Sequence, residues 1–144
     1  MLIGVDIGTG GTKALMLDAQ GRTLGEAFRE YGVLTPAPSW AEQWPDVWLE
    51  AVVGTLKDVL EQSKCDPKEI AAVAISGLYG GSGIPVDRDG RALRPCMIWM
   101  DRRAREETQW VKDNVPLEQI FSITGNYVDS YYGFTKILWM RNNE

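Results

Sequence analysis

Near its N-terminus the chain reads Asp6-Ile7-Gly8-Thr9-Gly10-Gly11-Thr12-Lys13. One apolar run, Leu2 to Ile7, leads into the glycines, and a second, Ala14 to Leu17, follows Lys13. Short apolar runs joined by glycines predict a strand, a tight loop and a second strand. A turn at Gln20-Gly21-Arg22 then leads into a third apolar run, Thr23 to Tyr31. The chain is therefore expected to open as an antiparallel meander of three strands.

The loop between the first two strands carries the groups that a bound phosphate needs. Asp6 ends an apolar strand, where a carboxylate is costly unless something positive meets it. Glycines allow a tight turn and let backbone N–H groups approach an anion, while threonine hydroxyls and a lysine add further donors. Magnesium needs a carboxylate that reaches its water shell, which makes Asp6 the candidate metal residue. The candidate phosphate-binding residues are Asp6, Gly8, Thr9, Gly10, Gly11, Thr12 and Lys13.

On spacing alone, a plain glycine hairpin after an aspartate explains this stretch equally well. Two other phosphate motifs do not fit. A Walker loop needs Gly-Lys-Ser/Thr at the start of a helix, whereas Lys13 leads into residues with strand character. The dinucleotide fingerprint needs a third glycine where Lys13 stands, followed by a helix.

Beyond the meander the pattern changes period. Apolar residues at helical spacing predict a helix that begins at Pro45, and Ile70 to Ser76 is apolar enough to predict a buried strand. The remaining expected elements are a glycine-rich turn at Gly77–Gly83, a ribbon formed by Ile84–Val86 and Cys96–Trp99, and helices over Asp101–Asn114, Pro116–Ile123 and Thr135–Arg141. This order predicts an α/β fold in which helices flank a mixed sheet, as at the start of a ribonuclease H-like nucleotide-binding domain. We expect residues 1–144 to be an incomplete N-terminal domain, because Ile137, Leu138 and Trp139 need something to cover them.

Composition excludes several classes of function. The chain has 144 residues, 44% of them hydrophobic, and a formal charge of −5, which argues against a nucleic-acid or membrane surface. There is no histidine, so His-based zinc sites and serine–histidine triads are excluded. Cys65 and Cys96 show no ligand spacing and indicate reduced thiols. Without a signal peptide or a membrane-length apolar run, a cytoplasmic location is expected.

Five motifs, in this order, resemble the FGGY family of carbohydrate kinases, within the actin and hexokinase superfamily. They are Gly4-Val5-Asp6-Ile7-Gly8-Thr9 through Lys13; Pro38-Ser39-Trp40-Ala41-Glu42-Gln43 with Pro45 and Trp48; Ile75-Ser76-Gly77; Pro95 with Ile98-Trp99-Met100-Asp101-Arg102-Arg103; and Thr124-Gly125 with Tyr131, Thr135-Lys136 and Trp139. The resemblance covers essentially the whole chain. It implies ATP-dependent phosphorylation of a sugar or polyol hydroxyl in a cleft between two ribonuclease H-like domains.

The resemblance also implies roles for individual residues. Asp6 would bind Mg²⁺ through water, and the loop from Gly8 to Lys13 would face the transferring phosphate of ATP. The residues expected to bind the sugar are Gly77, Leu78, Tyr79, Gly80, Asp101, Arg103 and Tyr131. No catalytic residue is expected within residues 1–144, because the family's base aspartate is expected after Glu144. This chain alone is therefore expected to be inactive.

The substrate is less defined than the reaction. Xylulose kinases carry Gln-Met-His-Gly where this chain has Leu78-Tyr79-Gly80-Gly81, and the Arg-Glu pair of glycerol kinases is absent as well. A pentulose is the favoured substrate, and a small sugar or polyol is the expected partner. The sequence leaves open whether the protein forms a homodimer.

Two other functions fit the same fold. One is an actin-like ATPase that assembles or binds a protein partner, and the other is a binding module without catalysis. Simpler interpretations also compete for single residues: ion pairs at a helix start for Asp101-Arg102-Arg103, packing for Trp40, Trp44 and Trp48, loop fixing or helix capping for Glu42 and Gln43, and a surface or helix-start position for Lys136.

Overall fold

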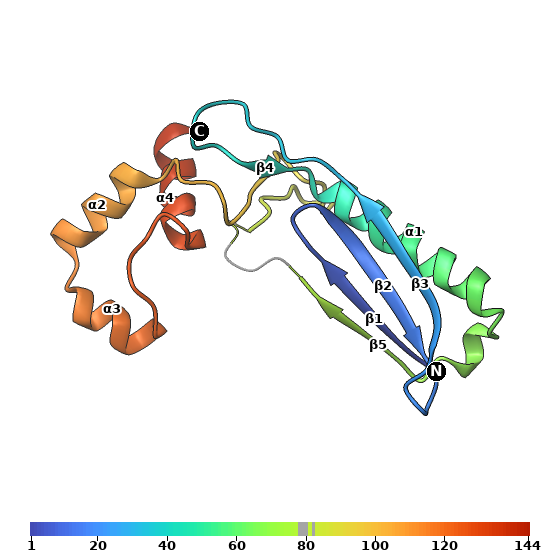
Figure 1. The fold of residues 1–144 in the computed structure, drawn as a ribbon. Helices are drawn as coiled ribbons and strands as arrows, with labels where there is room; N and C mark the ends of the chain where they lie inside the picture. The colour runs from blue at the N-terminus through green and yellow to red at the C-terminus, as the bar shows by residue number, and fades with distance from the viewer. Residues whose placement is uncertain (78–80, 82) are drawn as a thin grey trace. The chain divides into compact units, whose positions relative to one another are not determined.

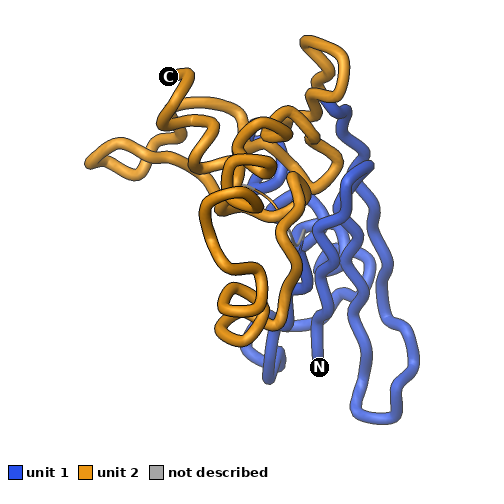
Figure 2. The backbone as a smooth tube through the Cα atoms, turned by 90° about the vertical axis from the view of Figure 1, so that its left-hand side faces the viewer, with its two compact units in different colours: residues 1–33, 44–78 blue, residues 34–43, 79–144 orange. Residues whose placement is uncertain are grey.

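The computed structural model describes residues 1–77, 81 and 83–144. The chain divides into two compact units, coloured separately in Figure 2. Unit 1 comprises residues 1–33 and 44–78, and unit 2 comprises residues 34–43 and 79–144. Within the described part of the chain, no helix has the length and apolar character needed to cross a bilayer.

Unit 1 is built on a four-stranded sheet in the order β3-β2-β1-β5 (Figure 1). The strands are β1 (Leu2–Ile7), β2 (Gly11–Leu17), β3 (Thr23–Glu30) and β5 (Ala72–Ser76). β1 pairs antiparallel with β2, and β2 with β3, whereas β5 runs parallel to β1. The predicted meander and the predicted mixed sheet are therefore both confirmed.

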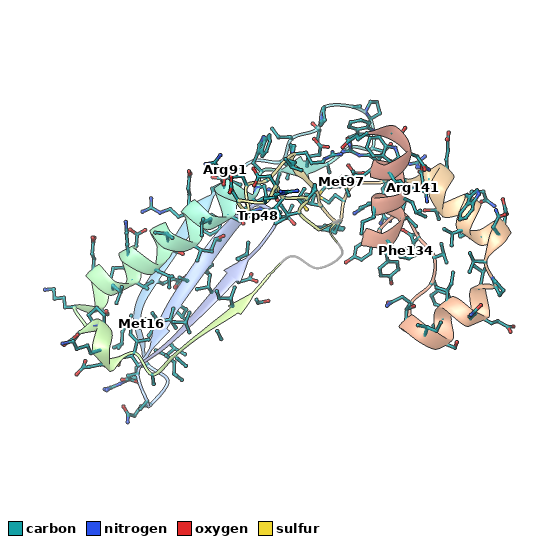
Figure 3. All side chains as sticks on the ribbon, turned by 180° about the vertical axis from the view of Figure 1, so that it is seen from behind. Met16, Trp48, Arg91, Met97, Phe134 and Arg141 are labelled. Carbon is teal, nitrogen blue, oxygen red and sulfur yellow. The ribbon has the colours of Figure 1, made fainter. Side chains whose placement is uncertain are left out.

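Helix α1 (Pro45–Ser63) packs on one face of this sheet. The predicted start at Pro45 is confirmed, because a proline in the first turn loses no hydrogen bond there. The close packing depends on Gly25, where a Cβ atom would lie 2.9 Å from the carbonyl oxygen of Val59. Met16, labelled in Figure 3, belongs to the core on this face. The buried residues of this core are Ile3, Val5, Ala14, Met16, Ala27 and Val59.

The prediction that Ile70–Ser76 forms a buried strand is wrong in its burial. The strand forms as β5, after the short 3₁₀ helix η1 (Pro67–Glu69), but all of its residues are exposed. Val73 is 50% exposed and Ile75 is 59% exposed. The reason is position: β5 is the outermost strand of the sheet, and α1 packs against β1, β2 and β3. The apolar composition therefore predicted the strand correctly but its burial wrongly.

Unit 2 contains short strands and three helices: β4 (Glu42–Gln43), β6 (Cys96–Met97), α2 (Arg105–Asn114), α3 (Leu117–Thr124) and α4 (Gly133–Asn143). The predicted ribbon is wrong, because β6 pairs with β4 and the turn at 87–90 closes only the isolated bridge between Val86 and Ala92. The last two helices are confirmed within a few residues. Gly125 ends α3 with a positive φ of 69°, a conformation in which glycine costs little.

Helix α2 begins four residues later than the predicted start at Asp101. The Asp101 carboxylate accepts the backbone N–H of Arg103 at 3.0 Å, so the side chain closes a local turn that competes with helix formation. The predicted end of this helix, at about Asn114, is confirmed.

Candidate functional site

The glycine loop of unit 1 is a hairpin turn between β1 and β2. Asp6 lies opposite Lys13 in the antiparallel register and opposite Ser76 in the parallel one. The backbone N–H of Gly8 donates to the carbonyl oxygen of Gly11 at 3.0 Å and closes the turn. The predicted strand-loop-strand is confirmed, and the register brings two charged side chains and a hydroxyl together at one end of the sheet.

The three glycines of this loop are not equivalent. A Cβ atom on Gly11 would lie 2.4 Å from the Phe28 ring and 2.6 Å from the carbonyl oxygen of Arg29, so packing requires glycine there. A Cβ on Gly8 would lie 3.1 Å from the Gly11 carbonyl oxygen. A Cβ on Gly10 would meet no atom within 4 Å, and Gly10 has no positive φ. Neither packing nor backbone conformation therefore accounts for Gly10, which leaves that stretch of backbone open to a ligand.

Thr12 lies beneath the loop rather than on its surface. It is fully buried, and its hydroxyl is 3.1 Å from the hydroxyl of Tyr31. The Tyr31 hydroxyl also donates to the carbonyl oxygen of Gly8 at 2.7 Å. Sequence reasoning gave Tyr31 no role. The hairpin register contained the signal, because Glu30 lies opposite Gly11 and so places the next residue beside the loop.

Lys13 and Asp6 face a hollow on the open side of the sheet. The Lys13 ammonium lies 2.8 Å from the Glu26 carboxylate, and both side chains are more than half exposed. The hydrogen bond and the charge of Glu26 raise the pKa of Lys13, so the lysine stays charged. The hollow has a volume of about 410 Å³ and is lined by Gly4, Val5, Asp6, Lys13, Leu15, Ala74, Ile75 and Ser76. An exposed ion pair of this kind is weak and can yield to a stronger anion.

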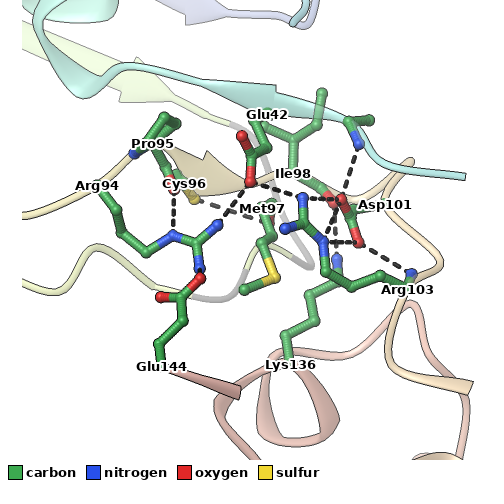
Figure 4. A network of polar contacts seen from close by, with 11 residues as sticks. Glu42, Arg94, Pro95, Cys96, Met97, Ile98, Asp101, Arg103, Lys136 and Glu144 are labelled. Atoms are coloured by element: carbon green, nitrogen blue, oxygen red, sulfur yellow. Dashed lines mark hydrogen bonds and ion pairs between the residues drawn. The ribbon is translucent and has the colours of Figure 1, made fainter. Parts of the chain in front are cut away.

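Asp101 and Arg103, two predicted sugar-binding residues, lie inside unit 2 (Figure 4). Asp101 is fully buried and accepts the backbone N–H of Ala41 at 2.7 Å. Nη2 of Arg103 donates to Asp101 and to Glu42, each at 2.6 Å. The guanidinium carbon lies 3.6 Å from the ring centre of Trp40, close enough for a cation–π contact. These contacts hold the segment 98–103 against β4, and they confirm ion pairing for Asp101 and Arg103, packing for Trp40 and loop fixing for Glu42.

Glu144, after which the base aspartate is expected, takes part in the same set of contacts. It follows the last residue of α4, and its carboxylate forms an ion pair with the guanidinium of Arg94 (Figure 4). Arg94 also pairs with Glu42 at 2.5 Å, so one guanidinium joins the end of α4 to β4. The Glu144 carboxylate is thus engaged in a structural contact, and we assign it no catalytic role. The base aspartate stays a prediction about the whole protein.

The surface position predicted for Lys136 is wrong, whereas the helix-start position is confirmed, because Lys136 lies in the first turn of α4. It is fully buried within α4, and its ammonium donates to the carbonyl oxygen of Ile98 at 2.7 Å. Burial lowers the pKa of Lys136 to about 8, although the charges of Asp101 and Cys96 act to raise it. The ammonium thus contacts the residue that follows β6, a contact that sequence spacing could not reveal.

Tyr131 lies beside Trp99, a residue to which the sequence assigned no site role. The two ring centres are 6.3 Å apart, and Trp99 is 38% exposed. Arg102 lies over the Tyr131 ring at 5.6 Å and forms an ion pair with Asp129. Asp129 also accepts the backbone N–H of Tyr131 at 2.7 Å, which fixes the start of the turn into α4. Half-exposed rings beside a guanidinium form a surface suited to hydroxyl-rich ligands.

The remaining predicted sugar-binding residues follow β5. Gly77 is exposed, and a Cβ there would meet no atom within 4 Å. Leu78, Tyr79 and Gly80 lie outside the described residues.

Comparison with known proteins gives a consistent result. A protein-family model, "FGGY family of carbohydrate kinases, N-terminal domain", matches residues 1–144. The xylulose kinase of Escherichia coli K12 is 31% identical over 144 residues, which is 100% of this chain and 29% of that protein. The glycerol kinase of Variovorax paradoxus is 28% identical over 143 residues, which is 99% of this chain and 29% of that protein.

A solved structure agrees. The crystal structure of a xylulose kinase from Rhodospirillum rubrum matches with a TM-score of 0.92 at 25% identity, over 99% of this chain and 29% of that one. The actin and hexokinase type of fold is thereby confirmed. The chain spans less than a third of the length of these relatives.

Proposed function

The chain belongs to the FGGY family of carbohydrate kinases, and on that premise we propose that the protein carrying it transfers phosphate from ATP to a sugar or polyol hydroxyl. The observation that carries the proposal is the loop from Asp6 to Lys13. In this loop, neither packing nor backbone conformation explains why residue 10 is a glycine. Phosphoryl transfer depends on alignment and charge neutralisation, so a rigid donor loop is the part of the machinery that this chain would supply.

Asp6 fits a magnesium role of a particular kind. Among the described residues, no group of three or more Asp, Glu, Cys or His side chains is arranged to hold a metal ion as a closed cage of protein ligands. Mg²⁺ bound with ATP keeps several waters and takes its other ligands from phosphate oxygens, so one exposed carboxylate suffices. Bound magnesium would neutralise phosphate charge, while Asp6 would hold its water shell at the end of β1.

For the sugar, the geometry favours a division of labour. Tyr131 and the neighbouring Trp99 present half-exposed rings that can pack on the carbon face of a polyol. Asp101 and Arg103 form hydrogen bonds with other residues of unit 2. We therefore propose that they support the surface formed by Tyr131 and Trp99. Gly77, Leu78, Tyr79 and Gly80 stay proposed substrate residues.

A pentulose is the proposed substrate, since the relatives compared include xylulose kinases. The Leu78-Tyr79-Gly80-Gly81 stretch departs from the xylulose-kinase pattern, so the pentulose need not be xylulose. Both cysteines are thiols, consistent with the proposed cytoplasmic location. A homodimer stays a prediction.

A coupled assay for ADP tests the proposal. The whole protein that carries this chain would be supplied with Mg²⁺, ATP and a panel of pentuloses, hexuloses, tetritols and glycerol. We expect ADP release only when an accepted sugar or polyol is present, and none from residues 1–144 alone. Turnover with no member of the panel, from well-folded protein, would contradict the proposal.

The same assay distinguishes a sugar kinase from the alternative, an actin-like ATPase. ATP hydrolysis that does not depend on sugar, together with nucleotide-dependent sedimentation into filaments, would favour an assembling ATPase.

A further inference from the structure

Tyr31 contacts the phosphate loop at three positions, although it follows β3 and lies outside every motif of the sequence. Its hydroxyl donates to the carbonyl oxygen of Gly8 at 2.7 Å and lies 3.1 Å from the Thr12 hydroxyl. Its backbone N–H donates to the carbonyl oxygen of Gly10 at 3.2 Å. One residue therefore holds the loop near its beginning, its middle and its end.

These contacts engage groups that would oppose an anion. Carbonyl oxygens carry partial negative charge, so a loop that binds phosphate must direct them away from the ligand and present N–H groups instead. Gly8 and Gly10 both direct their carbonyl oxygens to donors of Tyr31. The carbonyl oxygen of Gly11 is engaged by the N–H of Gly8 at 3.0 Å. Tyr31 thus supplies two of the three donors that hold the glycine carbonyls of this loop.

The Tyr31 hydroxyl is well suited to remain a donor. The side chain is half-buried, and burial raises its pKa, as does the nearby charge of Asp6, while the hydrogen bond with Thr12 acts in the opposite direction. The phenol therefore keeps its proton at neutral pH. The hydroxyl of Thr12 is fully buried beside it, so water does not compete freely for this contact.

We propose that Tyr31 is a positioning residue that fixes the Gly8–Gly11 loop with its carbonyl groups turned from the phosphates of ATP. This inference rests on the proposed function. Tyr31 itself touches neither substrate, and its effect on phosphate binding passes through Gly8, Gly10 and Thr12.

Tyr31→Phe is the test, because it removes the hydroxyl and keeps both the ring and the backbone bond to Gly10. Loss of hydroxyl contacts of this strength should raise the KM for ATP by about five-fold. The KM for the sugar should stay unchanged, because the Tyr31 contacts lie within the loop of unit 1. Tyr127→Phe is the matched control: Tyr127 is 77% exposed, so its hydroxyl removal should alter neither KM.

The kinetic results either support or overturn the role proposed for Tyr31. A selective rise in the KM for ATP supports the inference, whatever happens to the melting temperature. An unchanged KM for ATP overturns it, as does an equal rise in both KM values or a fall in kcat alone that follows reduced stability. No sugar-dependent turnover by the wild-type protein would instead overturn the proposed function, and the Tyr31 inference would fall with it.

Discussion

The glycine loop of unit 1, residues 6–13, and the charge network of unit 2 use similar residues in opposite ways. We define the charge network as Glu42, Asp101, Arg103 and Lys136. In the loop, Asp6 and Lys13 lie on the surface, and the nearest charged partner of Lys13 is an exposed glutamate. In the charge network, Asp101 and Lys136 are fully buried and hold neighbouring backbone. An exposed acid or base in a motif is accessible to a ligand, whereas a buried one holds the protein's own backbone, and burial distinguishes the two cases.

Asp101→Ala should cause the largest loss of stability. Removing one member of a buried, hydrogen-bonded ion pair costs about 3–5 kcal/mol. Here Arg103 would keep, among the described residues, only Glu42 as a carboxylate partner, and the backbone N–H of Ala41 would lose its acceptor. Urea denaturation measures the change. Asp58→Ala is the control, since Asp58 pairs with Arg29 at a more exposed position and should cost about 1 kcal/mol or less. Equal losses from the two variants would remove the contrast between buried and exposed charges.

Lys136 should make stability depend on pH. Its pKa is about 8 in the folded protein against 10.5 for an unperturbed lysine, so between these values the unfolded chain binds a proton that the folded chain has released. Folding stability should therefore rise with pH across this window, by up to about 3 kcal/mol. Lys136→Met should remove this rise.

The check is the difference between wild type and Lys136→Met in denaturation midpoints from pH 7 to pH 11, because other groups titrate equally in both. The groups acting on Lys136 are Asp101, Cys96, Arg102 and Arg103. A wild-type curve that runs parallel to the Lys136→Met curve would show that the lysine keeps its ordinary pKa.

Gly11 and Gly10 of the loop are expected to differ in what an alanine substitution changes: stability at Gly11 and the KM for ATP at Gly10. Gly11→Ala should cost about 1–3 kcal/mol, because its Cβ would overlap Phe28 and the backbone of Arg29. Gly10→Ala should change stability by less than about 0.5 kcal/mol, since its Cβ meets nothing. Gly10→Ala should nevertheless raise the KM for ATP, because the added methyl group would occupy the space left for phosphate. Thermal melts and ATP kinetics on both variants measure the two effects, and an unaltered KM in Gly10→Ala would count against a phosphate at that position.

Much of the fold was predictable because the signals are local. Glycine turns between apolar runs predicted β1 to β3, and Pro45 marked the start of α1. The cover of β5 and the pairing of β6 were not predictable, since both depend on which distant segment lies alongside.

The candidate site divides in the same way. The loop itself could be predicted because its glycines and candidate ligand groups lie within eight consecutive positions, and its phosphate role stays a proposal. Tyr31, Trp99 and the burial of Lys136 could not, because each depends on a contact with another part of the chain. The strand register places Tyr31 beside the loop, but it does not show which loop atoms the hydroxyl contacts.

Hydrogen–deuterium exchange of the whole protein, with and without Mg²⁺ and ATP, tests whether residues 8–13 bind the phosphates of ATP. We expect nucleotide to slow exchange of the backbone amides of residues 8–13, while amides of residues 98–103, already held by the charge network, change little. Unaltered exchange in residues 8–13 at saturating nucleotide would contradict the assignment of this loop to the phosphates of ATP.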